Sequence, residues 1–146
     1  MEELIDSLKK TLADSFAFYL KAHNFHWNVE GSDFAQLHGF FGDLYEEVFG
    51  AVDAIAEHIR VLGDYAPASF SRYSELSSIE DAVAIPVNAS IMVSTLREDN
   101  AKVIATLIEA YNYAEEQKKL GLANFIQDRI DAHEKHAWML RSIEKA

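Results

Sequence analysis

Cysteine is absent from the 146 residues, and proline occurs only twice. Without cysteine the chain forms no disulfide, no thiolate zinc site and no cysteine nucleophile. Two prolines and six glycines leave long stretches free to be helical. No apolar run is long enough to span a bilayer, and residues 1–6 are acidic where a signal peptide is basic and then apolar. These absences predict a cytoplasmic protein with no membrane partner.

Positive charge is also scarce, with 13 basic residues against 24 acidic ones and a formal net charge of −11. A surface this negative repels the phosphate backbone of nucleic acids. Lys9, Lys10 and Lys145 do not form a basic arm. We therefore expect no strong binding to DNA. The hydrophobic fraction of 49% and the length are those of one domain with its own core, predicted to cover residues 1–146.

Apolar residues recur every three or four positions along four long segments, which is the spacing of one helix face. No segment of any length shows the alternation that is typical of a strand, so the predicted fold class is all-α. The predicted helices run over residues 2–28, from a cap at Ser32 or Asp33 to residue 62, over 88–118 and over 122–144.

Residues 64–86 differ from the rest because they contain both prolines and a cluster of serines. This composition marks a connection, with one short helix predicted near residues 69–75. A connection of this length joins elements that do not form a tight hairpin. The predicted architecture is therefore an up-down four-helix bundle in which a long crossover joins helices two and three.

Two histidines flank the turn between the first two helices. An antiparallel hairpin brings His26 and His38 close enough to bind one metal ion. Further along, Asp53 and Glu57 share a helix face, where like charges repel unless a cation or a basic partner lies between them. Arg60 is the alternative basic partner. Taken singly, each group is more often structural, as a solvated acidic face or a hydrogen-bonded histidine at a helix end.

His38 and Asp53 cannot bind the same ion within one helix, because fifteen residues separate them by about 22 Å. They nevertheless point to roughly one side, since fifteen steps of about 100° bring Asp53 to within about 60° of His38. Two copies of the second helix, packed antiparallel about a two-fold axis, would place His38 of one chain beside Asp53 and Glu57 of the other. A metal site that uses all four of these residues must therefore lie between two subunits.

The run HWNVEG at residues 26–31, followed by His38, Asp53 and Glu57 at these spacings, resembles the Dps family of mini-ferritins. The run HEKHAWMLR at residues 133–141 is similar to the last helix of that family, so the resemblance covers nearly the whole chain. It implies a ferritin-like bundle that assembles through two-fold dimers into a hollow dodecamer. It also implies oxidation of Fe(II) by hydrogen peroxide or dioxygen at inter-subunit di-iron ferroxidase sites, storage of the ferric product, and protection against oxidative damage.

The same resemblance implies the roles of the site residues. His26 and His38 would be catalytic metal ligands from one chain, and Asp53 and Glu57 would be supplied by its partner. Carboxylate oxygens favour the ferric product and imidazole holds ferrous iron, so iron is the implied metal, with zinc as a substitute ion.

One position departs from the family pattern, which usually has an acid four residues after the second histidine. Here that position is Gly42. Either Asp43 reaches the centre through a local distortion of the helix, or the second iron position is weakened and filled by water. A weakened centre predicts reduced oxidase activity. It keeps open the alternative of a ferritin-like structural assembly protein with little activity.

Two further features have structural interpretations. His133-Glu134 begins like a zinc-protease motif, but His136 follows at a spacing of three rather than four, so structural or surface roles are predicted. Glycines inside the second helix cost about 1 kcal/mol each relative to alanine. Gly39, Gly42 and Gly50 are therefore predicted to mark close contacts between helices.

Overall fold

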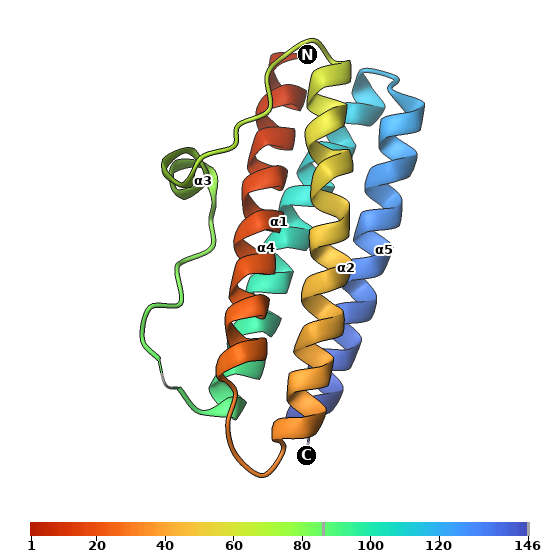
Figure 1. Cartoon of the computed structure of the whole chain (residues 1–146). Helices are drawn as coiled ribbons and strands as arrows, with labels where there is room; N and C mark the ends of the chain where they lie inside the picture. Colours follow the sequence, from red (N-terminus) through yellow and green to blue (C-terminus); the bar gives the residue numbers. More distant parts are fainter. Residues whose placement is uncertain (86, 146) are drawn as a thin grey trace.

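The computed structural model describes residues 1–85 and 87–145, and this part of the chain is all-α, as predicted (Figure 1). The two ends of the chain lie at opposite ends of a bundle of four long helices. The helices are α1 (Glu2–Asn28), α2 (Phe34–Val61), α3 (Phe70–Leu76), α4 (Ala89–Glu116) and α5 (Leu120–Glu144).

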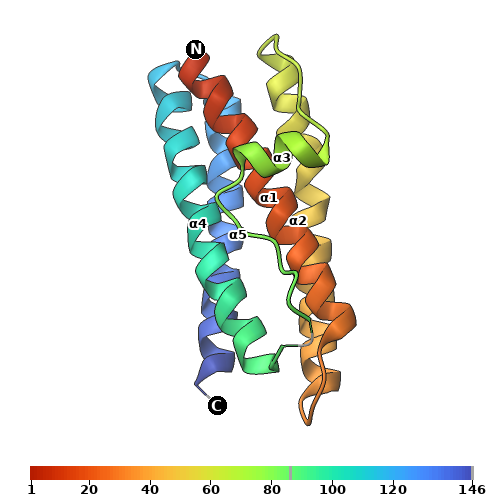
Figure 2. The ribbon, with the colours of Figure 1, turned by 90° about the vertical axis from the view of Figure 1, so that its left-hand side faces the viewer.

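The long crossover joins α2 to α4, which confirms the predicted up-down bundle. It carries the short helix α3 and runs along the outside of α1 to the opposite end of the bundle (Figure 2). Helix α1 packs against α2 and α4, and α4 packs against α5, whereas α2 and α5 touch only sparsely. No helix within the described ranges combines the length and apolar character that crossing a bilayer requires.

The apolar stripes of the four long helices meet in one core. Burying a side chain of this size contributes about 1.5–3 kcal/mol to the free energy of unfolding. The core therefore fixes how the helices rotate about their axes, and so which polar residues face outward. Its largest fully buried side chains are Phe18, Phe41, Leu4, Leu8, Leu12, Leu44, Ile55, Ile59, Met92, Leu96, Leu107 and Ile126.

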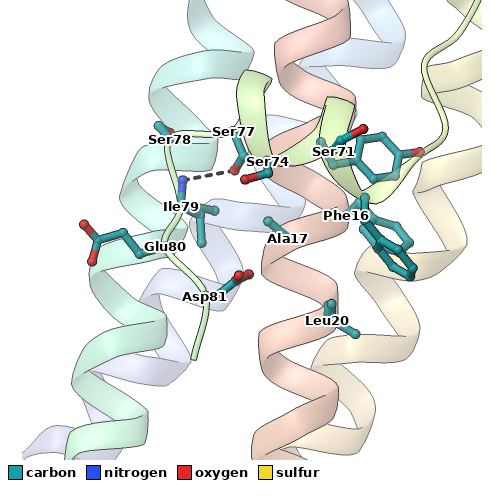
Figure 3. Close-up of a pocket in the computed structure, with 12 residues that line it drawn as sticks. Phe16, Ala17, Leu20, Ser71, Ser74, Ser77, Ser78, Ile79, Glu80 and Asp81 are labelled. Carbon is teal, nitrogen blue, oxygen red and sulfur yellow. Dashed lines mark hydrogen bonds between the residues drawn. The ribbon is translucent and has the colours of Figure 1, made fainter. Parts of the chain in front are cut away.

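A buried carboxylate attaches the crossover to the bundle. Asp14 of α1 is fully buried and accepts hydrogen bonds from the hydroxyl of Ser77 (2.8 Å), the amide of Ser78 (2.7 Å) and the hydroxyl of Ser78 (3.0 Å). Thr106 of α4 donates a fourth bond at 2.7 Å. The amide of Ile79 donates in turn to the hydroxyl of Ser77 (Figure 3). One acid thus holds α1, α4 and the crossover together.

A second polar network joins α2 to α5. Arg129 donates to both carboxylate oxygens of Glu47 at 2.6 and 3.0 Å, and Nε2 of His136 lies 2.7 Å from the same carboxylate. His133 is 1% exposed and is hydrogen-bonded to Asn100 through Nδ1 at 2.7 Å. Both histidines therefore contribute to packing within the bundle, in agreement with their structural interpretation.

This network makes the fold sensitive to acid. Burial lowers the pKa of His133 to about 3, from 6.5, and the positive charges of Arg129 and His136 act in the same direction. Burial alone would raise the pKa of Glu47, but hydrogen bonds from His136 and Arg129 outweigh it and hold that pKa well below its ordinary value. At pH values below the ordinary pKa of each group, His133 and Glu47 are therefore protonated in the unfolded chain but not in the folded one.

We expect the free energy of unfolding to fall as the pH drops from 6.5 towards 3, because protonation of His133 favours the unfolded chain. Glu47 adds to the loss below its ordinary pKa of 4.5. Denaturant unfolding at a series of pH values measures this slope. His133→Gln should unfold with a shallower dependence between pH 6.5 and 4.5, because the titrating group is gone. An identical slope in both proteins would contradict the assignment.

Candidate metal centre

A tight turn joins α1 to α2 and sets the first half of the candidate centre. Gly31 has a φ of 114°, a conformation that favours glycine because it lacks a Cβ, and its carbonyl accepts from Phe34 at 3.1 Å. Val29 beside it is 2% exposed and anchors the turn in the core. The last turn of α1 consequently lies beside the first turns of α2 (Figure 1).

The turn brings His26 and His38 together. Nδ1 of His26 lies 2.6 Å from the carbonyl oxygen of His38, and Nδ1 of His38 lies 2.6 Å from the carbonyl oxygen of His26. A carbonyl oxygen only accepts, so both Nδ1 atoms donate a proton, and in the neutral form of each imidazole the Nε2 atom is the one with a lone pair. This is the arrangement that orients a metal-binding imidazole. The two rings stack with centroids 3.8 Å apart and planes inclined by 17°.

Gly42 lies against the ring of His26. A Cβ at Gly42 would lie 3.1 Å from Cε1 and from Nδ1 of His26, so the prediction of a close contact between helices holds here. It was wrong at Gly39 and Gly50, where a Cβ would meet no other atom within 4 Å. Asp43, the next residue, lines a cavity of about 350 Å³ between α2 and α5, together with Glu47 and His136.

The carboxylate pair lies further along α2. Asp53 and Glu57 are exposed, and a shared hydrogen bond together with their mutual repulsion raises the pKa of the Glu57 carboxyl. The alternative that Arg60 compensates Glu57 was wrong. Arg60 donates to the carbonyl of Asp64 at 3.1 Å and lies 4.6 Å from the centre of the Tyr65 ring. A bound cation would relieve the repulsion between the two carboxylates.

One chain therefore presents two separate pairs of candidate metal ligands. Within residues 1–85 and 87–145, no three His, Asp or Glu side chains of one chain lie close enough together to hold a metal ion. His38 and Asp53 are about 22 Å apart along α2. Imidazole nitrogen with carboxylate oxygen is nevertheless a donor set that suits iron or zinc. Each pair alone supplies only two protein ligands, fewer than a metal site in proteins typically uses.

Aromatic side chains surround the histidine pair. Tyr45 stacks on His23 with ring centres 3.8 Å apart, and its ring lies 5.3 Å from that of His26. On its other side His23 lies 3.9 Å from Trp27, and Tyr19 is hydrogen-bonded to its Nδ1 at 3.0 Å. Burial, followed by the proximity of His26, lowers the pKa of His23. Sequence reasoning missed Tyr45 and His23, although His23 lies one helical turn before His26.

Comparison with known proteins identifies close relatives. The family model described as Ferritin-like domain matches residues 5–145. The DNA protection during starvation protein of Brevibacillus brevis is 35% identical over 136 residues, covering 92% of this chain and 90% of that protein. The crystal structure of Dps from Staphylococcus aureus has a TM-score of 0.93 at 28% identity, covering 99% of this chain and 96% of that one.

The Dps protein of Vibrio cholerae has a TM-score of 0.91 at 26% identity, covering 97% of this chain and 88% of that one. That protein is described as a member of a broad superfamily of ferritin-like diiron-carboxylate proteins.

Proposed function

Because this chain belongs to the ferritin-like family, and within it to the Dps proteins, we propose that it oxidises Fe(II) and stores the ferric product in a hollow homo-oligomer. One observation carries the proposal. The chain holds two oriented imidazoles at one end of α2 and two mutually repelling carboxylates further along it, with no complete metal site of its own in the described residues. The imidazole pair supplies nitrogen ligands and the carboxylate pair supplies oxygen ligands and negative charge.

We propose that each centre is lined by His26 and His38 of one chain and by Asp53 and Glu57 of its two-fold partner. An isologous dimer repeats every contact, so one dimer holds two centres. A dodecamer built from such dimers encloses the ferric product.

Exposed apolar side chains on α1, α2 and α3 support this assembly. Leu20 of α1 and Phe70 of α3 line a cavity of about 730 Å³ between α1 and the crossover (Figure 3). Phe70 is 83% exposed, and Phe49 of α2, 52% exposed, packs on Tyr19 of α1. Apolar groups gathered in this way favour burial against another surface. A second copy of the chain would cover them and bring its carboxylates to the histidines.

The oxidation needs an oxidant from solution, either hydrogen peroxide or dioxygen. With peroxide, two Fe(II) ions lose one electron each, and one H₂O₂ with two protons becomes two molecules of water. The protein contributes orientation through the two Nδ1–H···O=C bonds and negative charge through the two carboxylates. Carboxylate oxygens stabilise Fe(III) more than Fe(II), which favours the loss of the electron.

Replacing Asp53 tests the proposal. Asp53→Ala should lower the initial rate of ferric absorbance growth, after addition of Fe(II) and peroxide, by about 100-fold or more, since it removes a ligand. Glu98→Ala is the matched control, because Glu98 is an exposed acid on α4, away from both halves of the centre. An unchanged rate in Asp53→Ala would refute the site. Wild-type protein that assembles but oxidises Fe(II) no faster than a protein-free solution would support the structural alternative instead.

A further inference from the structure

A chain of aromatic rings leads from the histidine pair into the packing between α1 and α2. The ring of Tyr45 lies 5.3 Å from that of His26 and 6.0 Å from that of Tyr19. Both separations lie in the range at which aromatic rings touch. Electron transfer between touching rings is fast, because its rate falls exponentially with distance. Tyr19 is therefore connected to the candidate centre, although it lies about two turns of α1 away from His26.

The hydroxyl of Tyr19 has a base beside it. It lies 3.0 Å from Nδ1 of His23 and donates to that nitrogen in the tautomer that carries its proton on Nε2. Burial, followed by the proximity of Tyr45, raises the pKa of the Tyr19 hydroxyl, so the hydroxyl keeps its proton. A phenol that loses an electron also loses its proton, since the radical cation is a strong acid. Tyr19 can therefore give up an electron while its proton moves to His23.

The proposed oxidation creates a use for such a donor. One H₂O₂ accepts two electrons, and a centre that holds a single Fe(II) supplies only one of them. The products are then Fe(III), hydroxide and a hydroxyl radical, which attacks nearby side chains without selectivity. An electron from a phenol converts the hydroxyl radical into hydroxide and leaves a phenoxyl radical, which is far less reactive. A phenol connected to the histidine pair would therefore limit damage to the protein.

We infer that Tyr19 is a one-electron donor to the shared centre, with Tyr45 as the intermediate ring and His23 as the acceptor of the hydroxyl proton. The inference rests on the proposed function and adds three residues outside its metal ligands. Fe(II), H₂O₂ and the Tyr19 phenol together become Fe(III), hydroxide, water and the Tyr19 phenoxyl radical. The O–O bond breaks, iron and Tyr19 lose one electron each, and the proton held by His23 converts one of the two hydroxides into water.

Electron paramagnetic resonance of the assembled protein tests the inference. The protein is loaded anaerobically with one Fe(II) per centre, mixed with H₂O₂ and frozen. The wild type should give a tyrosyl signal, and Tyr19→Phe should abolish it. His23→Phe, which keeps a ring beside Tyr45 but removes the proton acceptor, should abolish it as well. A spin trap should capture more hydroxyl radical from Tyr19→Phe than from the wild type, an effect that a purely structural role of Tyr19 would not produce.

Tyr113→Phe is the matched control. Tyr113 lies near the C-terminal end of α4, at the other end of the bundle from the turn between α1 and α2 (Figure 1). Its replacement should leave the tyrosyl signal unchanged. Circular dichroism checks that each variant folds. Wild-type protein made with ring-deuterated tyrosine should give a narrower signal, which identifies the radical as tyrosyl without any substitution.

The outcomes separate the inference from the proposed function. Ferric absorbance is recorded in the same samples, and growth no faster than in a protein-free solution would refute the proposed function itself. If iron is oxidised but the tyrosyl signal is missing from the wild type or persists in Tyr19→Phe, Tyr19 is not the donor. A signal that persists in His23→Phe would refute the proton transfer. Trp27 also lies against His23, so a tryptophanyl signal that only Trp27→Phe removes would assign the donation to Trp27 and overturn the inference.

Discussion

Two inactive variants should restore activity to one another when they assemble together. His38→Ala removes a donor from the imidazole half and Asp53→Ala removes one from the carboxylate half. In a mixed two-fold dimer both defects fall in one centre, and the other centre receives an intact half from each chain. With random pairing half of the dimers are mixed, so about a quarter of all centres should be active.

The two variants are co-expressed and the assembled protein is purified. Its rate of Fe(II) oxidation, relative to the wild type, measures the fraction of active centres. Each variant alone should be inactive. His26→Ala co-expressed with His38→Ala is the matched control, because both defects lie in the same half and every centre in the mixture stays damaged. Recovery in the control, or none in the His38→Ala and Asp53→Ala mixture, would mean that the donors do not come from different chains.

The largest effect on stability is expected at Asp14. Asp14→Ala leaves Thr106, Ser77 and the amide of Ser78 without their acceptor inside the protein. Each buried donor left unpaired costs about 1–3 kcal/mol, so the three together cost about 3 kcal/mol or more. For a chain of this size that lowers the melting temperature by about 10 °C.

Thermal unfolding followed by circular dichroism measures the loss. Asp6→Ala is the matched control, since Asp6 is an exposed acid on the same helix and should change the melting temperature little. Hydrogen exchange at the amides of Ser78 and Ile79 should accelerate in Asp14→Ala, because the crossover loses its attachment to α1 and α4. If Asp14→Ala and Asp6→Ala have the same melting temperature, Asp14 does not anchor the crossover.

Most of the fold could be predicted from helical periodicity and turn chemistry. The bounds of α1 were predicted to the residue. The predicted end of α2, residue 62, is one residue beyond its observed end at Val61, and Gly63 follows with a φ of 98°. For the short helix the serine cluster was informative, since the hydroxyl of Ser69 caps α3 by accepting from the amide of Arg72.

The turn between α4 and α5 shows why other boundaries were missed. The third helix was predicted to reach residue 118, but it ends at Glu116 because Lys118 adopts a φ of 54°. The amide of Lys119 then bonds to the carbonyl of Ala114 at 2.9 Å, a helix end that glycine usually forms. The predicted start of the last helix was also wrong, because α5 begins at Leu120, two residues before residue 122.

For the candidate site, spacing predicted the separation of the two halves but not their surroundings. Residue counting alone placed His38 far from Asp53 along one helix. It did not show that the His26 ring packs on Gly42, or that Tyr45 and His23 stack beside it. Those contacts depend on how α1 rotates against α2, which the packing of the whole core decides.

The paired bonds between each imidazole and the opposite backbone have a consequence for the order of events. They form within a single chain, so the nitrogen donors are positioned as the hairpin folds, before any neighbour or ion arrives. The entropy of ordering these side chains is therefore lost during folding rather than during capture of the metal. A newly synthesised subunit would carry a prepared but incomplete binding site, and docking of its neighbour would be the event that starts the chemistry.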